Sequence, residues 1–381
     1  MRKGWEYKKL GEVCTLISDG SHNPPKGIDN SLYRMISSQN VFDDNLQITE
    51  DNVRYITETD HLCENKRTKL QKDVVLLTIV GTIGRSCVLK GNEGCLTLQR
   101  SVAALHPSDQ IMPRYLMHCL IGNRHTLNQE AHGIAQKGIY LKQLSSLSIP
   151  LPPLSTQLSI VSELDKINEL IRLKKEQHKD FDNLAQSIFY EMFGDPVENE
   201  RGWEVKKISN IAKYHNGVAH EQDIDKDGDF VLINAKFISS EGQIKKYTSI
   251  QRFPLFKNDI VMVLSDLPNG KSLAKCFLID EDNKYTLNQR ICCFRGFDGS
   301  SIYLKNIINR NPYLLSFDNG KGQTNLRKGD VEKIPIPLPP LPLQHLFAQR
   351  IEQIEHQKAE VQKSIMDLET LLASRMQYWF E

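Results

Sequence analysis

Three short runs combine residue types that could do chemistry. Asn23-Pro24-Pro25-Lys26 is similar to the Asn/Asp-Pro-Pro-aromatic signature of amino-methyltransferases, but a lysine replaces the aromatic and no glycine-rich loop follows a strand upstream. Gly270-Lys271-Ser272 has the ending of a phosphate-binding P-loop, but Ser265 stands where that motif requires a glycine. Residues 223–228 copy the first half of a calcium-binding loop, but Asn234 replaces the bidentate glutamate at its twelfth position. These departures favour ordinary turns over catalytic, nucleotide or calcium sites.

Length and composition limit the class of protein. The 381 residues predict two or three domains, and a hydrophobic content of 40% is sufficient for real cores. We find no apolar run near the ~18 residues of a membrane helix, and the start MRKGWEYKK lacks the apolar middle of a signal peptide. None of the eight cysteines forms a Cys-x-x-Cys pair, which predicts reduced thiols in a cytoplasmic protein without a metal site or disulfide framework. The net charge of +1 does not by itself indicate a nucleic-acid partner.

The elements that must position any site come from an internal repeat. The hexamer IPLPPL occurs at 149–154 and again at 336–341, and its flanks match as well. GWEYKKL at 4–10 corresponds to GWEVKKI at 202–208. Further matches pair Asp73 with Asp259, Tyr115-Leu116 with Tyr303-Leu304, and Gln99-Arg100 with Gln289-Arg290. The two halves are therefore diverged copies of one unit.

Each copy is expected to contain a globule followed by a long helix. The globules, 1–150 and 195–337, mix short β-branched runs with Gly, Asn and Pro turns, and the strands expected there include 74–80, 260–264 and 290–294. The helices, 151–194 and 338–381, carry heptad spacing. Its positions are Ile160, Leu164, Ile167, Ile171, Lys174, His178, Phe181, Ala185, Ile188 and Met192, then Phe347, Ile351, Ile354, Lys358, Val361, Ile365, Leu368, Leu372, Arg375 and Trp379. The polar members of this stripe are expected to fix register.

The prolines of each IPLPPL segment cannot join a helix interior, so the segment is a rigid exit from its globule, and Ser155 can cap the helix that follows. Joining RMQYWFE at 375–381 to MRKGWEYKK at 1–9 nearly recreates the junction between the first helix and the second globule. The second helix should therefore return to the first globule. This predicts an α+β fold with two pseudo-repeat α/β globular domains separated by a two-helix antiparallel coiled coil.

This order of globule, proline segment, heptad helix and FGDP junction resembles the specificity (S) subunit of type I restriction–modification systems. Further matching runs are Asp19-Gly20-Ser21-His22-Asn23-Pro24, Gly81-Thr82-Ile83-Gly84-Arg85 and Leu287-Asn288-Gln289-Arg290. The resemblance implies two target recognition domains that each read half of a bipartite sequence in double-stranded DNA, with helices that set the gap. It implies no catalysis by this chain and no cofactor in it. The expected partners are two methylation subunits, which carry S-adenosylmethionine, and restriction subunits, which use ATP with magnesium.

The residues expected to contact DNA are polar or basic side chains on turn-rich loops, because Arg, Lys, Asn, Gln and Ser can hydrogen-bond base edges. They are Ser21, His22, Asn23, Lys26, Thr82, Arg85, Gln99 and Arg100 in the first globule, and Asn269, Lys271, Ser272, Gln289 and Arg290 in the second. Because the two globules differ in sequence, the expected target is asymmetric. Two alternatives remain at this point: a DNA methyltransferase or nuclease acting alone, and a structural coiled-coil adaptor.

Overall fold

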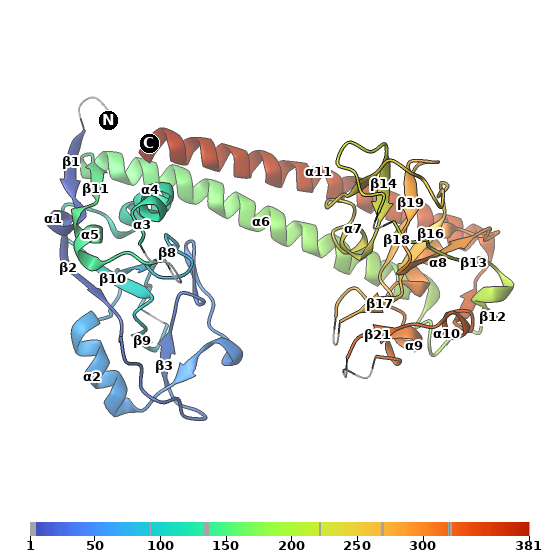
Figure 1. Ribbon diagram of the computed structural model, residues 1–381, viewed down its shortest axis with the longest axis horizontal. Helices are drawn as coiled ribbons and strands as arrows, with labels where there is room; N and C mark the ends of the chain where they lie inside the picture. The colour runs from blue at the N-terminus through green and yellow to red at the C-terminus, as the bar shows by residue number, and fades with distance from the viewer. Residues whose placement is uncertain are drawn as a thin grey trace. The chain divides into compact units, whose positions relative to one another are not determined.

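A computed structural model of the chain describes residues 5–91, 93–132, 137–220, 222–267, 270–318, 320 and 322–380 (Figure 1). The chain forms two compact units. Unit 1 contains Met1–Lys175 and Lys363–Glu381, and unit 2 contains Glu176–Gln362. The two long helices, α6 (Leu154–Phe193) and α11 (Leu341–Phe380), each contribute one part to each unit. Among the described residues, no helix has the length and apolar character that crossing a membrane requires.

Unit 1 is built around a four-stranded antiparallel sheet in the order β2-β10-β7-β8. A three-stranded sheet, β6-β3-β9, packs beside it, and β1 pairs with β11 next to the start of α6. The strands are β1 (Glu6–Lys9), β2 (Cys14–Asp19), β3 (Tyr33–Ile36), β4 (Val41–Phe42), β5 (Asn45–Leu46), β6 (Arg54–Tyr55), β7 (Val75–Thr78), β8 (Ser86–Val88), β9 (Cys95–Leu98), β10 (Val102–Pro107) and β11 (Ser148–Leu151). The helices are α1 (Leu10–Val13), η1 (Glu50–Asn52), α2 (Glu58–Thr68), α3 (Pro113–Gly122), α4 (Arg124–Gln129) and α5 (Leu141–Ser146).

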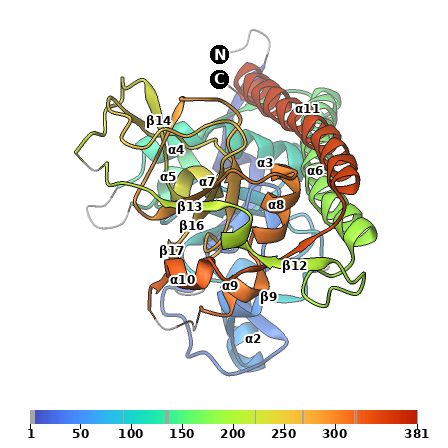
Figure 2. The ribbon, with the colours of Figure 1, turned by 90° about the vertical axis from the view of Figure 1, so that its right-hand side faces the viewer.

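Unit 2 repeats this topology (Figure 2). The sheet β13-β20-β16-β18 corresponds to the four-stranded sheet, β15-β14-β19 to the three-stranded sheet, and β12-β22 to the terminal pair. The strands are β12 (Glu204–Lys207), β13 (Lys213–Asn216), β14 (Phe230–Ile233), β15 (Tyr247–Thr248), β16 (Ile260–Val263), β17 (Ser265–Asp266), β18 (Cys276–Leu278), β19 (Tyr285–Leu287), β20 (Ile291–Arg295), β21 (Thr324–Asn325) and β22 (Pro335–Leu338). The helices are η2 (Ile208–Asn210), α7 (Ala235–Ser239), α8 (Ser301–Ile308), α9 (Pro312–Leu315) and α10 (Lys328–Val331). The predicted repeat is confirmed in these three pairs of sheets.

The central strands β7 and β16 are mostly apolar because both faces of their sheets are covered. In β7, Val75 and Leu77 pack into the core that contains α3 and α6, while Leu76 packs into the core beside β9. In β16, Ile260 and Met262 face α8 and the long helices, while alternate residues face β14 and β19. Each domain therefore has two cores divided by one sheet, with its loops left at the sheet ends.

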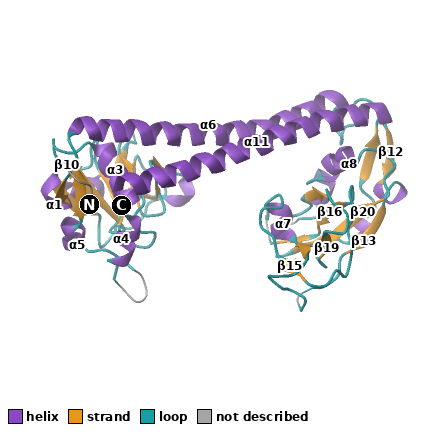
Figure 3. Cartoon of the chain, turned by 90° about the horizontal axis from the view of Figure 1, so that it is seen from above, coloured by secondary structure: helices purple, strands orange, loops and turns teal. Residues whose placement is uncertain are grey.

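The long helices pair antiparallel within each unit (Figure 3). In unit 1, Lys175 of α6 donates to Glu369 of α11 at 2.7 Å, and Glu163 pairs with Arg375 further along both helices. In unit 2, Lys358 donates to Asp182 at 2.6 Å, and the rings of Phe193 and Phe347 lie 5.2 Å apart. The heptad stripe is the buried face: its buried members are Ile160, Leu164, Ile167, Ile171 and Met192 of α6 and Phe347, Ile351, Ile354, Lys358, Val361 and Ile365 of α11. The predicted antiparallel helix pair is confirmed.

The return of α11 to the first domain is visible in the aromatic contacts of unit 1. Trp5 stacks on Trp379 with ring centroids 6.1 Å apart, and the Phe380 ring lies 5.7 Å from Tyr115 of α3. A Cβ added at Gly122 of α3 would lie 2.8 Å from the Phe380 ring, so this glycine makes room for the helix end. The second helix thus returns to the first domain, as the sequence predicted, and its Phe380 joins the core of that domain.

The start of α6 differs from the sequence expectation. The helix begins at Leu154, and Pro153 accepts the first backbone bonds, so Ser155 lies inside the first turn instead of capping it. The anchoring residue is Gln157, which is fully buried. Its Oε1 accepts from the backbone N–H of Met112 at 2.9 Å, and its Nε2 donates to the carbonyls of Gln110 and Pro152, both at 2.9 Å.

Gln344 occupies the corresponding place at the start of α11. Its Oε1 accepts from the backbone N–H of Ser300 at 3.1 Å, and its Nε2 donates to the Pro339 carbonyl at 2.8 Å. A buried glutamine therefore joins the proline segment, the long helix and the start of α3 or α8 in both copies. The prolines stiffen the exit, and the glutamine fixes it to the domain.

Candidate nucleic-acid interface

The strand registers bring several candidate residues to one edge of each domain. In unit 1, Asp19 pairs with Ala103, Thr78 with Val102, and Leu77 with Ser86, so β2 and β7 end where β8 and β10 begin. We call the segments 20–26, 79–85 and 99–101, which follow or precede these strand ends, the loop edge of unit 1. The loop edge of unit 2 consists of the matching segments 217–220, 264–267 with 270–275, and 288–290. Candidates separated by up to 79 residues in the sequence, Ser21 and Arg100, thus share one edge.

Backbone hydrogen bonds hold the loop edge of unit 1 together. The Ser21 N–H donates to Leu98 at 2.8 Å, and the Ser21 carbonyl accepts from the Arg100 N–H at 2.9 Å. The Ile79 N–H donates to the Ser101 carbonyl at 2.9 Å, which joins the β7–β8 loop to the same turn. The three segments therefore form one connected surface on a rigid sheet, which suits a site that must keep its geometry.

The loop edge of unit 2 has counterparts of the Ser21–Leu98 and Ile79–Ser101 bonds. Val218 donates to the Leu287 carbonyl and Leu264 donates to the Arg290 carbonyl, both at 3.0 Å. Both edges also need a glycine at the close approach of two segments. A Cβ at Gly20 would lie 2.1 Å from the Leu98 carbonyl oxygen, and one at Gly217 would lie 2.0 Å from that of Asn288.

These registers correct one sequence match. Leu98 pairs with Ile36 and Leu287 with Ile233, while Val102 and Ile291 are the corresponding starts of β10 and β20. Structural equivalence therefore aligns Gln99-Arg100-Ser101 with Asn288-Gln289-Arg290, one residue away from the match of the two Gln-Arg pairs. The match of Gln99-Arg100 with Gln289-Arg290 was misleading because the two turns share a backbone conformation and not their side chains. Position by position, Arg100 corresponds to Gln289.

The candidates of unit 1 differ in exposure. The side chains of Asn23, Lys26, Thr82 and Arg100 are exposed, and those of Arg85 and Gln99 are half-buried. Ser21 is buried at 7% exposure, so its role at the edge is carried by its backbone. Three contacts tie this set to the rest of the domain. His22 Nε2 hydrogen-bonds Asp19 at 2.7 Å, and the Arg85 guanidinium lies 4.6 Å from the centre of the Phe42 ring. The Pro25 carbonyl, beside Lys26, accepts a hydrogen bond from Arg54 at 3.0 Å.

In unit 2, Lys271, Gln289 and Arg290 are exposed at the loop edge. Ser272 is half-buried and bonds the hydroxyl of Ser239 at 2.6 Å, while its N–H donates to Asp266 at 2.7 Å. Asn269 lies outside the described residues. The structure therefore brings the candidates of each half to a shared edge and leaves a smaller exposed set on it.

Supporting residues were not found from the sequence. A buried threonine at the same place in β9 and β19 is bonded by a histidine in each unit: Thr97 by His61 at 2.8 Å, and Thr286 by His220 at 3.0 Å. Burial lowers the pKa of His61 below its ordinary value, which favours the neutral ring. The two histidines come from unrelated chain positions, α2 in one copy and the loop after β13 in the other. The two threonines align only at the structural register, one residue away from the match of the Gln-Arg pairs, so the sequence match did not reveal them.

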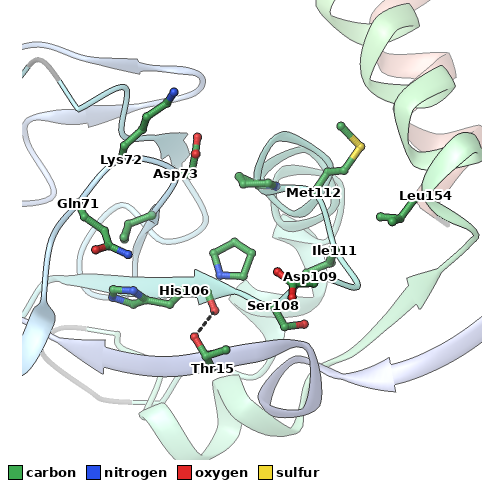
Figure 4. A pocket seen from close by; sticks show the side chains of 13 residues that line it. Thr15, Gln71, Lys72, Asp73, His106, Ser108, Asp109, Ile111, Met112 and Leu154 are labelled. Carbon is green, nitrogen blue, oxygen red and sulfur yellow. Dashed lines mark hydrogen bonds between the residues drawn. The ribbon is translucent and has the colours of Figure 1, made fainter.

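A cavity of about 400 Å³ in unit 1 lies at the other end of the sheet (Figure 4). It is lined by Thr15 and His106, whose carbonyl accepts from Thr15 Oγ1 at 3.2 Å, and by Leu154 at the start of α6. A cavity of about 670 Å³ in unit 2 is likewise lined by the proline segment and Gln344. None of the candidate residues lines either cavity. Both belong to the junction of domain and helix and are separate from the loop edges.

Comparison with known proteins agrees with this architecture. The family model of the type I restriction modification DNA specificity domain matches twice, at residues 2–180 and 200–369. The chain therefore belongs to the family of type I restriction–modification DNA specificity proteins. This confirms the resemblance and favours a DNA target-recognition subunit over a methyltransferase or nuclease acting alone and over a structural adaptor.

Relatives and solved structures fit the same family. The chain is 28% identical over 135 residues to the type I restriction enzyme EcoBI specificity subunit of Escherichia coli, which covers 34% of this chain and 28% of that protein. It is 22% identical to a provisionally named type I restriction enzyme specificity subunit, MjaX, of Methanocaldococcus jannaschii, over 92% of this chain and 87% of that protein. The fold is similar to the type I restriction–modification S subunit from M. genitalium, with a TM-score of 0.56, 12% identity and coverage of 99% and 96%. It is also similar to a chain from work on complex assembly and conformational transition of the type I R-M system, with a TM-score of 0.59, 15% identity and coverage of 100% and 98%.

Proposed function

We propose that each globular domain reads one half of an asymmetric, bipartite sequence in double-stranded DNA, with target domains at 1–150 and 195–337. The observation that carries this proposal is the pair of loop edges, which share several backbone bonds and differ in their exposed side chains. Base edges are read by hydrogen-bonding side chains such as Arg, Gln and Asn, while phosphate contacts position the protein. Two matching surfaces with different side chains support two different half-sites.

We further propose that the helices α6 and α11 set the spacing between the half-sites. Each helix is 40 residues long, which is about 60 Å at 1.5 Å per residue. Their antiparallel pairing and the buried glutamines at their starts support a rigid mounting of each domain. A stiff connection is what a fixed spacer requires, because a flexible one would tolerate several gaps.

The chemistry is proposed to lie with partners: two methylation subunits that use S-adenosylmethionine, and restriction subunits that use ATP with magnesium, assembled with this chain in the cytoplasm. Exposed leucines on both long helices support docking of the methylation subunits there. They include Leu158, Leu170, Leu173 and Leu184 on α6, with Leu346 and Leu371 on α11. This chain is proposed to provide recognition without catalysis.

The experiment is a methyl-transfer assay with labelled S-adenosylmethionine on genomic DNA. We expect no transfer by the purified chain alone, none by the methylation subunit alone at specific sites, and sequence-specific transfer by the assembled complex. Site-specific transfer by this chain alone would overturn the non-catalytic role. A complex that methylates without sequence preference would overturn the recognition role.

A further inference from the structure

We propose that the turn between β9 and β10 and its counterpart between β19 and β20 are base-reading positions, with Arg100 and Gln289 as their specificity-determining residues. This inference rests on the proposed function and assigns the chemistry of one position in each half-site. Arg100 is inferred to select a guanine in the half-site of the first domain. Gln289 is inferred to select an adenine in the half-site of the second.

The backbone of the two turns is the same. Gln99 donates to the Ile36 carbonyl at 2.9 Å, and Asn288 donates to the Ile233 carbonyl at 3.1 Å. Each turn then closes on itself, because the N–H of Val102 or Ile291 donates to the carbonyl of its first residue at 3.0 Å. The middle residue of each turn therefore starts from an equivalent frame, and only its side chain differs between the domains.

The turn is an exposed tip on a buried base. Leu98 and Val102 on either side of the first turn, and Leu287 and Ile291 beside the second, are fully buried. Arg100 and Gln289 between them are exposed. Among the described residues, the Arg100 side chain has no hydrogen bond or ion pair, so its guanidinium is available to a ligand. Because the turn backbone is already fixed, only the side chain has to be ordered when it meets a base edge.

The two side chains have different and well-defined base chemistry. The guanidinium fork donates two hydrogen bonds to O6 and N7 of guanine, and the glutamine amide both donates and accepts at N6 and N7 of adenine. Because the two turns hold the same place in the fold, we infer that both approach a base in the same way, and that Arg100 selects guanine where Gln289 selects adenine. The rival role is a phosphate contact, which would add affinity without sequence preference.

The test uses the full chain assembled with its methylation subunit and a library of targets randomised one position at a time. Arg100→Gln is expected to move the preference from guanine to adenine at one position of one half-site. Gln289→Arg is expected to make the reverse change at one position of the other half-site. Loss of a bidentate base contact should reduce discrimination at that position by about 5- to 150-fold. All other positions should remain unchanged.

Two controls separate base reading from charge and from folding. Arg100→Lys keeps the positive charge but lacks the fork, so it should relax the same position while leaving affinity for non-specific DNA unchanged. Lys90→Gln removes an exposed charge beyond the end of β8 that lies away from the loop edge, and should leave every position unchanged. Unchanged thermal unfolding of each variant confirms that the exposed turn still rests on its buried base.

An unaltered motif in both Arg100→Gln and Gln289→Arg would overturn the inference while leaving the proposed function standing. An equal loss of affinity for all sequences, rescued by Arg100→Lys, would overturn it in favour of a phosphate contact. A wild-type complex without any sequence preference would instead refute the proposed function itself.

Discussion

Replacing Gln157 with leucine should destabilise unit 1 far more than its location at the start of a helix suggests. The side chain is fully buried and makes three hydrogen bonds, to the Met112 N–H and to the carbonyls of Gln110 and Pro152. Leucine has a similar length but leaves these three backbone groups without their partner. A buried polar group left unsatisfied costs about 1–3 kcal/mol. Because water in the neighbouring cavity can satisfy part of these three groups, we expect the free energy of unfolding to fall by about 3–5 kcal/mol.

Urea unfolding of the full chain, followed by circular dichroism, measures this loss as a shift of the midpoint at constant slope. The matched control is Gln110→Leu: the same substitution on an adjacent but exposed side chain, whose Oε1 accepts from Lys8 at 2.9 Å. Exposed substitutions of this kind usually change stability by less than about 0.5 kcal/mol. Equal effects of Gln157→Leu and Gln110→Leu would refute the reasoning that the buried glutamine fixes the helix to the domain.

Three further predictions concern spacing, the loop edge and pH. Removing one heptad from both α6 and α11 shortens each helix by about 10.5 Å, so the spacer should become about three base pairs shorter while both half-site sequences stay the same. Methylome sequencing measures the spacer, and an unchanged length would show that the helices do not set it. Gly20→Ala should disrupt the close approach of this residue to the Leu98 carbonyl and weaken recognition of one half-site. The control Gly329→Ala, which has no atom within 4 Å of the added Cβ, should leave recognition unchanged. Mapping the methylated targets of both variants tests this prediction. Burial opposes ionisation of Asp165, but hydrogen bonds from His118 and Arg114 hold its pKa below the usual value. Its contribution to stability is therefore complete above the unfolded carboxyl pKa of about 3.9 and lost as pH falls through the lower folded value; Asp165→Asn should flatten that part of the acid unfolding curve, and an identical curve would contradict this origin.

The repeat, the two long helices and their antiparallel pairing could be predicted because they depend on periodic patterns. Heptad spacing places Ile160 and Leu164 on one face whatever the rest of the chain does. The likeness of the joined ends, RMQYWFE at 375–381 and MRKGWEYKK at 1–9, to the junction of the first helix and the second globule made the return of α11 predictable, and the stacking of Trp5 on Trp379 confirms it.

For the loop edges, the sequence predicted which types of residue take part but not how the two turns align. Composition pointed to Arg100 and Gln289, but letter identity aligned the two turns one residue out of register. Register is decided by sheet hydrogen bonds between distant segments, such as Gln99 with Ile36, and these leave no local pattern in the sequence. Burial of Ser21 was missed for the same reason. Gln157 and Gln344 did align in the repeat, but a glutamine beside prolines has no distinctive signature until its three partners are seen.

The base-by-base requirement of the wild-type complex tests the account most directly. Methylome sequencing of cells that express this chain with its methylation subunit would report it. Two different reading domains on a fixed spacer predict two separate blocks of specified bases, different in sequence, with an unspecified gap of fixed length between them. A single continuous block, or two blocks related by inversion, would contradict it.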